Sequence, residues 1–92
     1  MNPSALEIRE ARAAVERILE ALGLRDFVFT IEPKGDGWQL RLECSTVEGW
    51  QSLTLPAEIA ELRASLRDAA VHEHLCADWQ ARLNACRRSD RT

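Results

Sequence analysis

Two histidines and a cysteine lie close together in the last third of the chain, at His72, His74 and Cys76. Imidazole and thiolate groups are preferred zinc ligands, and a His beside a Cys can also activate a thiol nucleophile. In a helix, His72 and Cys76 share a face because they are four residues apart, whereas His74 points nearly the opposite way. No second pair completes a metal shell, and only the isolated Cys44 and Cys86 remain as further thiols. We therefore expect no metal site and no nucleophilic enzyme here.

Other groups that could do chemistry are also better explained by structure. Carboxylates that could form an acid–base pair occur at helical spacing, in Glu58 with Glu61 and in Glu16 with Glu20. Such pairs are typical of a solvated helix surface. The Gly-Asp-Gly run at 35–37 is too short to cradle phosphate and fits a hairpin turn. The sequence thus predicts a protein that is not an enzyme and takes no cofactor, metal or small-molecule ligand.

Length, composition and charge limit the domain organisation and the kinds of partner that the protein can have. The chain has 92 residues, 46% hydrophobic and 29% charged, with a formal net charge of −3, which predicts one globular domain over residues 1–92. The negative charge argues against nucleic acid as the partner, because phosphate binding needs a concentrated cationic surface. No apolar run approaches the roughly 18 residues that a membrane-spanning helix needs.

The three cysteines and residues 1–12 indicate the cellular compartment of the protein. Cys44, Cys76 and Cys86 are odd in number and lack C-x-x-C spacing, unlike the disulfide framework of small secreted domains. We interpret them as reduced thiols. Residues 1–12 carry several charges and no apolar centre, so they do not resemble a secretion signal. These features predict a cytoplasmic protein.

The elements that position these residues follow from periodicity. An amphipathic helix begins with the capping residues 2–4 and ends at Gly23. Three strands follow at 27–32, 38–44 and 50–55, and their short connections predict an antiparallel meander. Pro56 then closes the third strand and opens a final helix. The order helix–strand–strand–strand–helix (αβββα) predicts an α+β two-layer sandwich, with helices packed on one sheet face, a long or kinked C-terminal helix and a loose tail at 86–92.

The apolar stripe of the final helical segment changes face. Ile59, Leu62 and Leu66 share one direction, and at about 100° per residue the later set lies roughly opposite: Val71, Leu75, Trp79, Leu83 and Cys86. A break near Arg67–Asp68, with Asp68 as N-cap, would fold the second half back. Against a break, the segment lacks Gly and Pro, and Ala69-Ala70 favours a continuous helix. We expect a continuous or gently kinked helix, whose second half projects and forms an intermolecular contact in a homodimer.

Trp50 is the remaining candidate anchor. The register places it on the open, polar sheet face, where an exposed Trp is typical of protein interfaces. A bulge near Gly49 would instead turn it into the core. The sequence leaves both alternatives open.

The αβββα order resembles that of double-stranded-RNA-binding domains, which grip phosphate with a Lys-rich start to the last helix. Here the matching segment, residues 56–61, carries two glutamates and no lysine. We therefore expect a small cytosolic protein-interaction module, such as an adaptor, an inhibitor or a partner-specific chaperone, using Val71, Leu75, Trp79, Leu83 and Trp50. The alternative is a divergent RNA- or DNA-binding domain using a C-terminal arginine cluster of Arg82, Arg87, Arg88 and Arg91.

Overall fold

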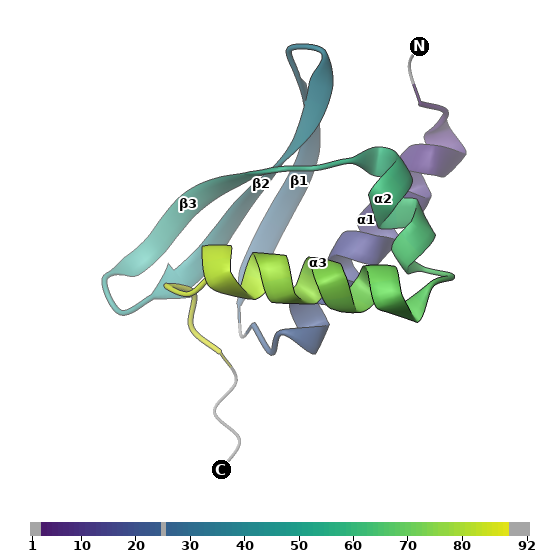
Figure 1. The fold of residues 1–92 in the computed structure, drawn as a ribbon. Helices are drawn as coiled ribbons and strands as arrows, with labels where there is room; N and C mark the ends of the chain where they lie inside the picture. The colour runs from purple at the N-terminus through teal and green to yellow at the C-terminus, as the bar shows by residue number, and fades with distance from the viewer. Residues whose placement is uncertain (1–2, 25, 89–92) are drawn as a thin grey trace.

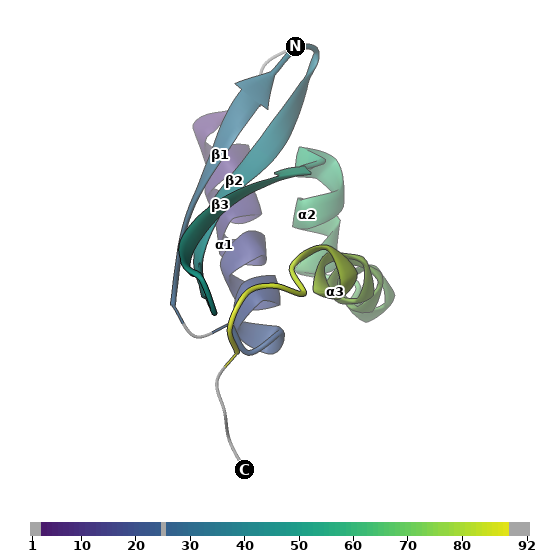
Figure 2. The same cartoon turned by 90° about the vertical axis from the view of Figure 1, so that its left-hand side faces the viewer.

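The protein was analysed as a computed structural model, which describes residues 3–24 and 26–88. Its elements are α1 (Ala5–Ala21), β1 (Phe27–Lys34), β2 (Gly37–Thr46), β3 (Gly49–Pro56), α2 (Ile59–Ser65) and α3 (Ala69–Arg82). The strands form one open antiparallel sheet, and the helices lie on one side of it (Figure 1; Figure 2). The predicted α+β class and three-stranded meander are confirmed.

The sheet has the order β1-β2-β3, and both pairings keep an uninterrupted antiparallel register. Leu42, for example, lies between Phe29 of β1 and Leu53 of β3. Side chains alternate across the sheet as the sequence predicts. The inner face supplies the buried residues Ile31, Leu40, Leu42, Cys44 and Leu55. The open face is mostly polar, so one-sided burial of the sheet is confirmed.

A capping box begins α1 at Ser4. The Ser4 Oγ accepts a hydrogen bond from the Glu7 N–H at 3.1 Å, and the Glu7 carboxylate accepts one from the Ser4 N–H at 2.8 Å. The hydrogen bond that the Ser4 backbone N–H donates to the carboxylate is the largest cause that lowers the pKa of Glu7, and the Ser4 hydroxyl lowers it further. Gly23 follows the helix with a φ of 75°, the left-handed geometry predicted for it.

Arg63 ties α2 to α1. Its Nε lies 2.7 Å from the Glu10 carboxylate, and its Nη1 lies 3.1 Å from the Glu7 carboxylate. The hydrogen bond from Arg63 lowers the pKa of Glu10. The guanidinium therefore connects two turns of α1 with one residue of α2, which supports the angle between the two helices.

The C-terminal third divides into two helices, so the expected continuous or gently kinked helix is wrong. α2 ends at Ser65, and Asp68 begins α3 by accepting a hydrogen bond from the Ala70 N–H at 2.9 Å. The alternative break at Arg67–Asp68 is therefore the correct one. Helix propensities differ by tenths of a kcal/mol per residue, whereas each buried Leu or Trp contributes about 1.5–3 kcal/mol or more. Burial of the second stripe thus outweighs the propensity for continuity.

The break folds α3 back across the sheet, as Figure 1 shows. Leu75, Trp79 and Leu83 are 5%, 2% and 0% exposed, and they join the same core as the inner sheet face and α1. Val71 packs against this core half-buried. The second stripe therefore does not project into solvent, and its partner is the protein's own core.

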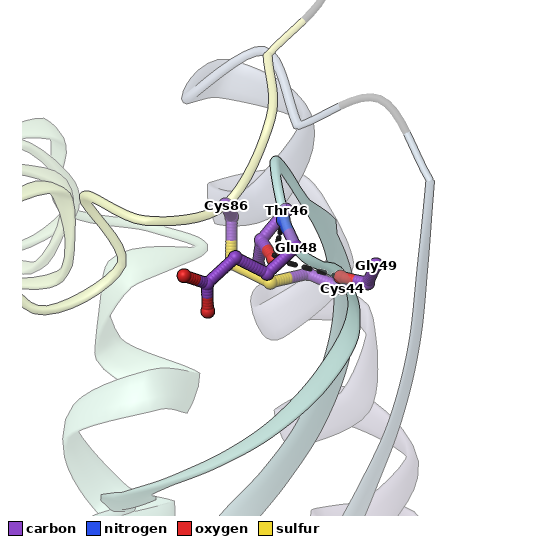
Figure 3. The surroundings of a disulfide bond; sticks show 5 residues. All are labelled: Cys44, Thr46, Glu48, Gly49 and Cys86. Carbon is purple, nitrogen blue, oxygen red and sulfur yellow. Dashed lines mark hydrogen bonds between the residues drawn. A yellow bond between two sulfur atoms is a disulfide. The ribbon is translucent and has the colours of Figure 1, made fainter.

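A disulfide joins Cys44 of β2 to Cys86, in the segment after α3 (Figure 3). The two Cα atoms lie 5.6 Å apart, and both side chains are buried. Our interpretation of these two cysteines as reduced thiols is therefore wrong, and Cys76 alone is a free thiol. The fold-back of α3 brings Cys86 to the end of β2. Because the two residues are 42 positions apart, the spacing of the cysteines in the sequence does not predict that they pair.

The first part of the expected loose tail is fixed in the fold. Cys86 is disulfide-bonded, the Arg87 N–H donates a 2.7 Å hydrogen bond to the Ser45 carbonyl, and Arg88 forms an antiparallel bridge with Leu24. This segment lies beside β2 just beyond the start of β1. The rest of the predicted tail, residues 89–92, lies outside the described residues.

We expect Cys86→Ser to lower the free energy of unfolding by about 2–4 kcal/mol, because the disulfide restricts the unfolded chain. Urea denaturation followed by circular dichroism measures this change. Cys76→Ser is the matched control, since it removes a thiol without breaking the bridge. Equal stability of the oxidised wild type and Cys86→Ser would contradict the prediction.

Candidate interaction surface

The structure separates the residues that the sequence grouped as an interaction site. Leu75, Trp79 and Leu83 are buried and Val71 is half-buried, so these four form part of the core. Trp50 is 59% exposed and lies opposite Ser45, on the open sheet face. Of the two alternatives for Trp50, the exposed position is the one observed. The fold brings the stripe residues together, and it places Trp50 away from them.

His72 and Cys76 do meet, as their spacing predicts. Cys76 Sγ lies 3.5 Å from His72 Nε2 on α3. Burial raises the pKa of the Cys76 thiol, and the Glu73 carboxylate raises it further, so the neutral thiol is favoured over the thiolate. Within residues 3–24 and 26–88, no group of three or more His, Cys, Asp or Glu residues could hold a metal ion. The raised pKa of Cys76 thus disfavours the thiolate that a nucleophile or a metal ligand would need.

The arginines of the alternative nucleic-acid surface have other contacts. Arg82 forms an ion pair with Asp78 at 3.2 Å, one turn earlier on α3. Arg87 is exposed, and Arg88 is half-buried beside Leu24. Arg91 lies outside the described residues. Of the described arginines in this cluster, Arg82 thus has part of its charge offset by Asp78.

The outer edge of β3 is a surface that the sequence reasoning missed. The Ala57 N–H donates to the Trp38 carbonyl at 3.0 Å, which extends the β2–β3 ladder by one hydrogen-bonded pair. Pairing alternates along an antiparallel ladder, so the N–H and C=O groups of Trp50, Ser52 and Thr54 point away from β2. Pro56 takes the next outward position, where its missing N–H does not interrupt the ladder. It belongs to β3, and contrary to our expectation it does not open α2, which begins at Ile59.

This edge is open in the part of the chain that the structure describes. β3 is the last strand of the sheet, and no described backbone group pairs with its outer side. Figure 2 shows β3 nearest the viewer, with α2 and α3 to one side of it. Edge strands usually carry charges, prolines or bulges that prevent further pairing. Residues 49–56 contain no charged residue, and Pro56 stands at the far end.

The opposite edge differs in carrying charges, and its proline lies within the strand. β1 contains Glu32, Pro33 and Lys34, and Pro33 occupies an outward position because Glu32 and Lys34 lie in the hydrogen-bonded pairs with β2. From α1, the Arg12 guanidinium lies 5.4 Å from the centre of the Phe29 ring. β1 is therefore a protected edge, and β3 is the unprotected one.

A shallow groove runs beneath the free edge, on the inner face of the sheet. It has a volume of about 560 Å³ and lies between the β2–β3 hairpin and the end of α3, lined by Thr46, Val47, Glu48, Gln51, Leu53, Asn84 and Ala85. Leu53 contributes a half-buried apolar side chain, and Val47 at the hairpin turn is 87% exposed. We define the β3 edge site as the outward backbone groups of residues 50–54 together with Trp50 and this groove. The charge-free strand was the available sequence signal, and its position at the edge became visible only in the sheet.

Comparison with known proteins gives no relative: no protein family, no curated protein and no solved structure matches the chain. Among the described residues, no helix is both long enough and apolar enough to cross a membrane. The interpretation of the β3 edge site therefore depends on its own geometry.

Two tryptophans distinguish core from surface. We expect Trp79→Ala to lower the free energy of unfolding by about 3–5 kcal/mol, or to prevent cooperative folding, because the indole is buried. The matched change Trp50→Ala should stay within about 0.5 kcal/mol of the wild type, because the side chain is exposed. Urea denaturation measures both. A small effect of Trp79→Ala would show that α3 does not pack as described.

Proposed function

We propose that this protein is an interaction module that binds an extended segment of a partner protein along the β3 edge site. The observation that carries the proposal is the unprotected edge of β3, a regular strand without charge. Strand addition satisfies the outward N–H and C=O groups through main-chain hydrogen bonds, while side-chain pockets give specificity. This is the role of an adaptor, an inhibitor or a partner-specific chaperone, and it requires no catalytic residue.

The surroundings of β3 support strand addition over other modes of binding. An added strand has side chains on both faces, and this site offers a different environment on each. On the open face, the exposed Trp50 supplies a large amphipathic contact. On the inner face, the groove with Leu53 accepts an apolar side chain. A partner strand with alternating apolar and polar residues fits both faces at once.

Peptide capture tests this function. We expect a displayed library of ten-residue peptides to yield binders with alternating apolar and polar residues. Their addition should shift the backbone amide signals of Trp50, Ser52 and Thr54 in NMR spectra. Ser52→Pro removes an outward N–H without breaking the β2–β3 ladder, so it should weaken binding by about tenfold or more.

Ser52→Ala is the matched control for peptide capture. It removes the hydroxyl and keeps the N–H, so strand pairing predicts near-wild-type affinity. Loss of binding in both variants would indicate recognition of the hydroxyl and contradict strand addition. Failure to select any peptide, or shifts confined to the helices, would also contradict the proposal.

We retain the cytoplasm as the proposed location, and the disulfide supplies its test. Cytosolic glutathione and thioredoxin keep most protein thiols reduced. A cytoplasmic location therefore predicts that all three cysteines react with an alkylating agent when acid-quenched cells are dissolved in a neutral denaturant, as intact mass shows. Reaction at Cys76 alone would mean that Cys44 and Cys86 are bridged in the cell, and would place the protein in an oxidising compartment.

A further inference from the structure

We propose that the occupant of the β3 edge site is a second copy of this chain, paired antiparallel through β3 about a twofold axis. The inference rests on the proposed function, because it names the partner of the same edge. It assigns the contact to a surface quite different from the α3 stripe, which is buried. The pairing would join two three-stranded sheets into one continuous sheet.

The outward positions of β3 define the register. With Ser52 opposite the partner's Ser52, Trp50 lies opposite the partner's Thr54, and each such pair exchanges two hydrogen bonds. All three residues have exposed side chains on the open sheet face. An aromatic residue opposite a β-branched one is a favourable cross-strand pair. The strand is therefore complementary to itself, as a twofold interface requires.

The inner face fits the same register. Gln51 lies opposite the partner's Leu53 when Ser52 lies on the axis. Gln51 lines the groove beneath the edge together with Leu53, Asn84 and Ala85. The partner's Leu53 therefore reaches the groove beside Gln51, and the twofold axis repeats this contact on the other subunit. A groove that is open in one chain is filled in the pair.

Charge favours a second copy as the occupant. Because β3 carries no charge, self-pairing brings no like charges face to face. The hairpin charge nearest the axis is Glu43, which lies opposite Ser52 on the open face. With neighbouring strands about 4.8 Å apart, the two Glu43 residues are three strand spacings, or about 14 Å, from each other, which exceeds the Debye length at physiological salt. Glu48 lies opposite the partner's Pro56, so the two Glu48 residues are about 27 Å apart.

A cation also lies within reach of the added strand. Arg41 is opposite Thr54 in the β2–β3 register, so the partner's Trp50 lies in the same row beyond Thr54, two strand spacings or about 10 Å from Arg41 between backbones. The long arginine and indole side chains can span this distance across the small Thr54. Arg41 is half-exposed and ion-paired with Glu32 at 3.2 Å, on the same open face. A guanidinium close to an indole ring gains a cation–π attraction. Each subunit thus offers an arginine to the tryptophan that the other supplies.

Charge complementation at Ser52 tests the pairing. We expect sedimentation of the wild type to show a dimer at micromolar to submillimolar concentration. Ser52→Glu places like charges across the axis and beside Glu43 of β2, so it should raise the dimer dissociation constant about fivefold or more. Ser52→Lys also places like charges across the axis, but Glu43 partly neutralises them, so its effect should be smaller. An equimolar mixture of the two variants should restore dimers, because opposite charges then face each other. Ala77→Lys, which adds the same charge on the exposed side of α3, should dimerise like the wild type.

Three outcomes would overturn the dimer. These are a monomeric wild type at all concentrations, a dimer unaffected by Ser52→Glu, and a mixture that stays monomeric while both variants keep the wild-type circular dichroism spectrum. A wild type that is monomeric and still captures strand peptides at β3 overturns only the second copy as occupant. Absence of both dimers and peptide capture removes the proposed function as well.

Discussion

The burial of Trp79 and Leu83 depends on a local event, the N-cap that Asp68 provides between α2 and α3. Once the chain turns there, the apolar stripe of α3 meets the inner sheet face and α1, and the core is filled. The same turn directs the end of α3 to the end of β2, where Cys86 meets Cys44. The core, the disulfide and the position of residues 86–88 are therefore consequences of one change in chain direction.

This arrangement also decides which surface remains for a partner. The helices cover the inner face, Pro33 and Arg12 protect the β1 edge, and Arg87 and Arg88 extend the sheet beside β2. β3 has no comparable protection among the described residues. A natural strand of this length without charge at a sheet edge invites pairing, which makes the edge more informative about function than any polar cluster in the chain.

In the structure, where Cys44 and Cys86 are bridged, the disulfide lies directly behind the β3 edge site. Cys44 lies directly opposite Gln51 in the β2–β3 register, so the bridge anchors the base of the hairpin that carries Trp50. The Thr46 hydroxyl adds two local bonds, donating to the Gly49 carbonyl at 2.7 Å and accepting from the Glu48 N–H at 3.1 Å (Figure 3). A hairpin held in this way loses little conformational entropy when a strand is added, and such preorganisation favours binding.

The sequence by itself determined the local features of this protein. The Ser4 cap, the Gly23 cap and the alternation of the strands follow from side-chain chemistry within a few residues, and periodicity also located the change of face at Asp68. Only the tertiary structure decided that the helix breaks there, that Cys44 and Cys86 pair, and that β3 is the unprotected edge. Each of these depends on contacts between segments distant in the sequence, where the free energy of burial outweighs local helix propensity. The apolar stripe of α3, which the sequence predicts to be a partner surface, is therefore part of the core. The uncharged strand β3, to which the sequence analysis assigned no role beyond Trp50, is the candidate site.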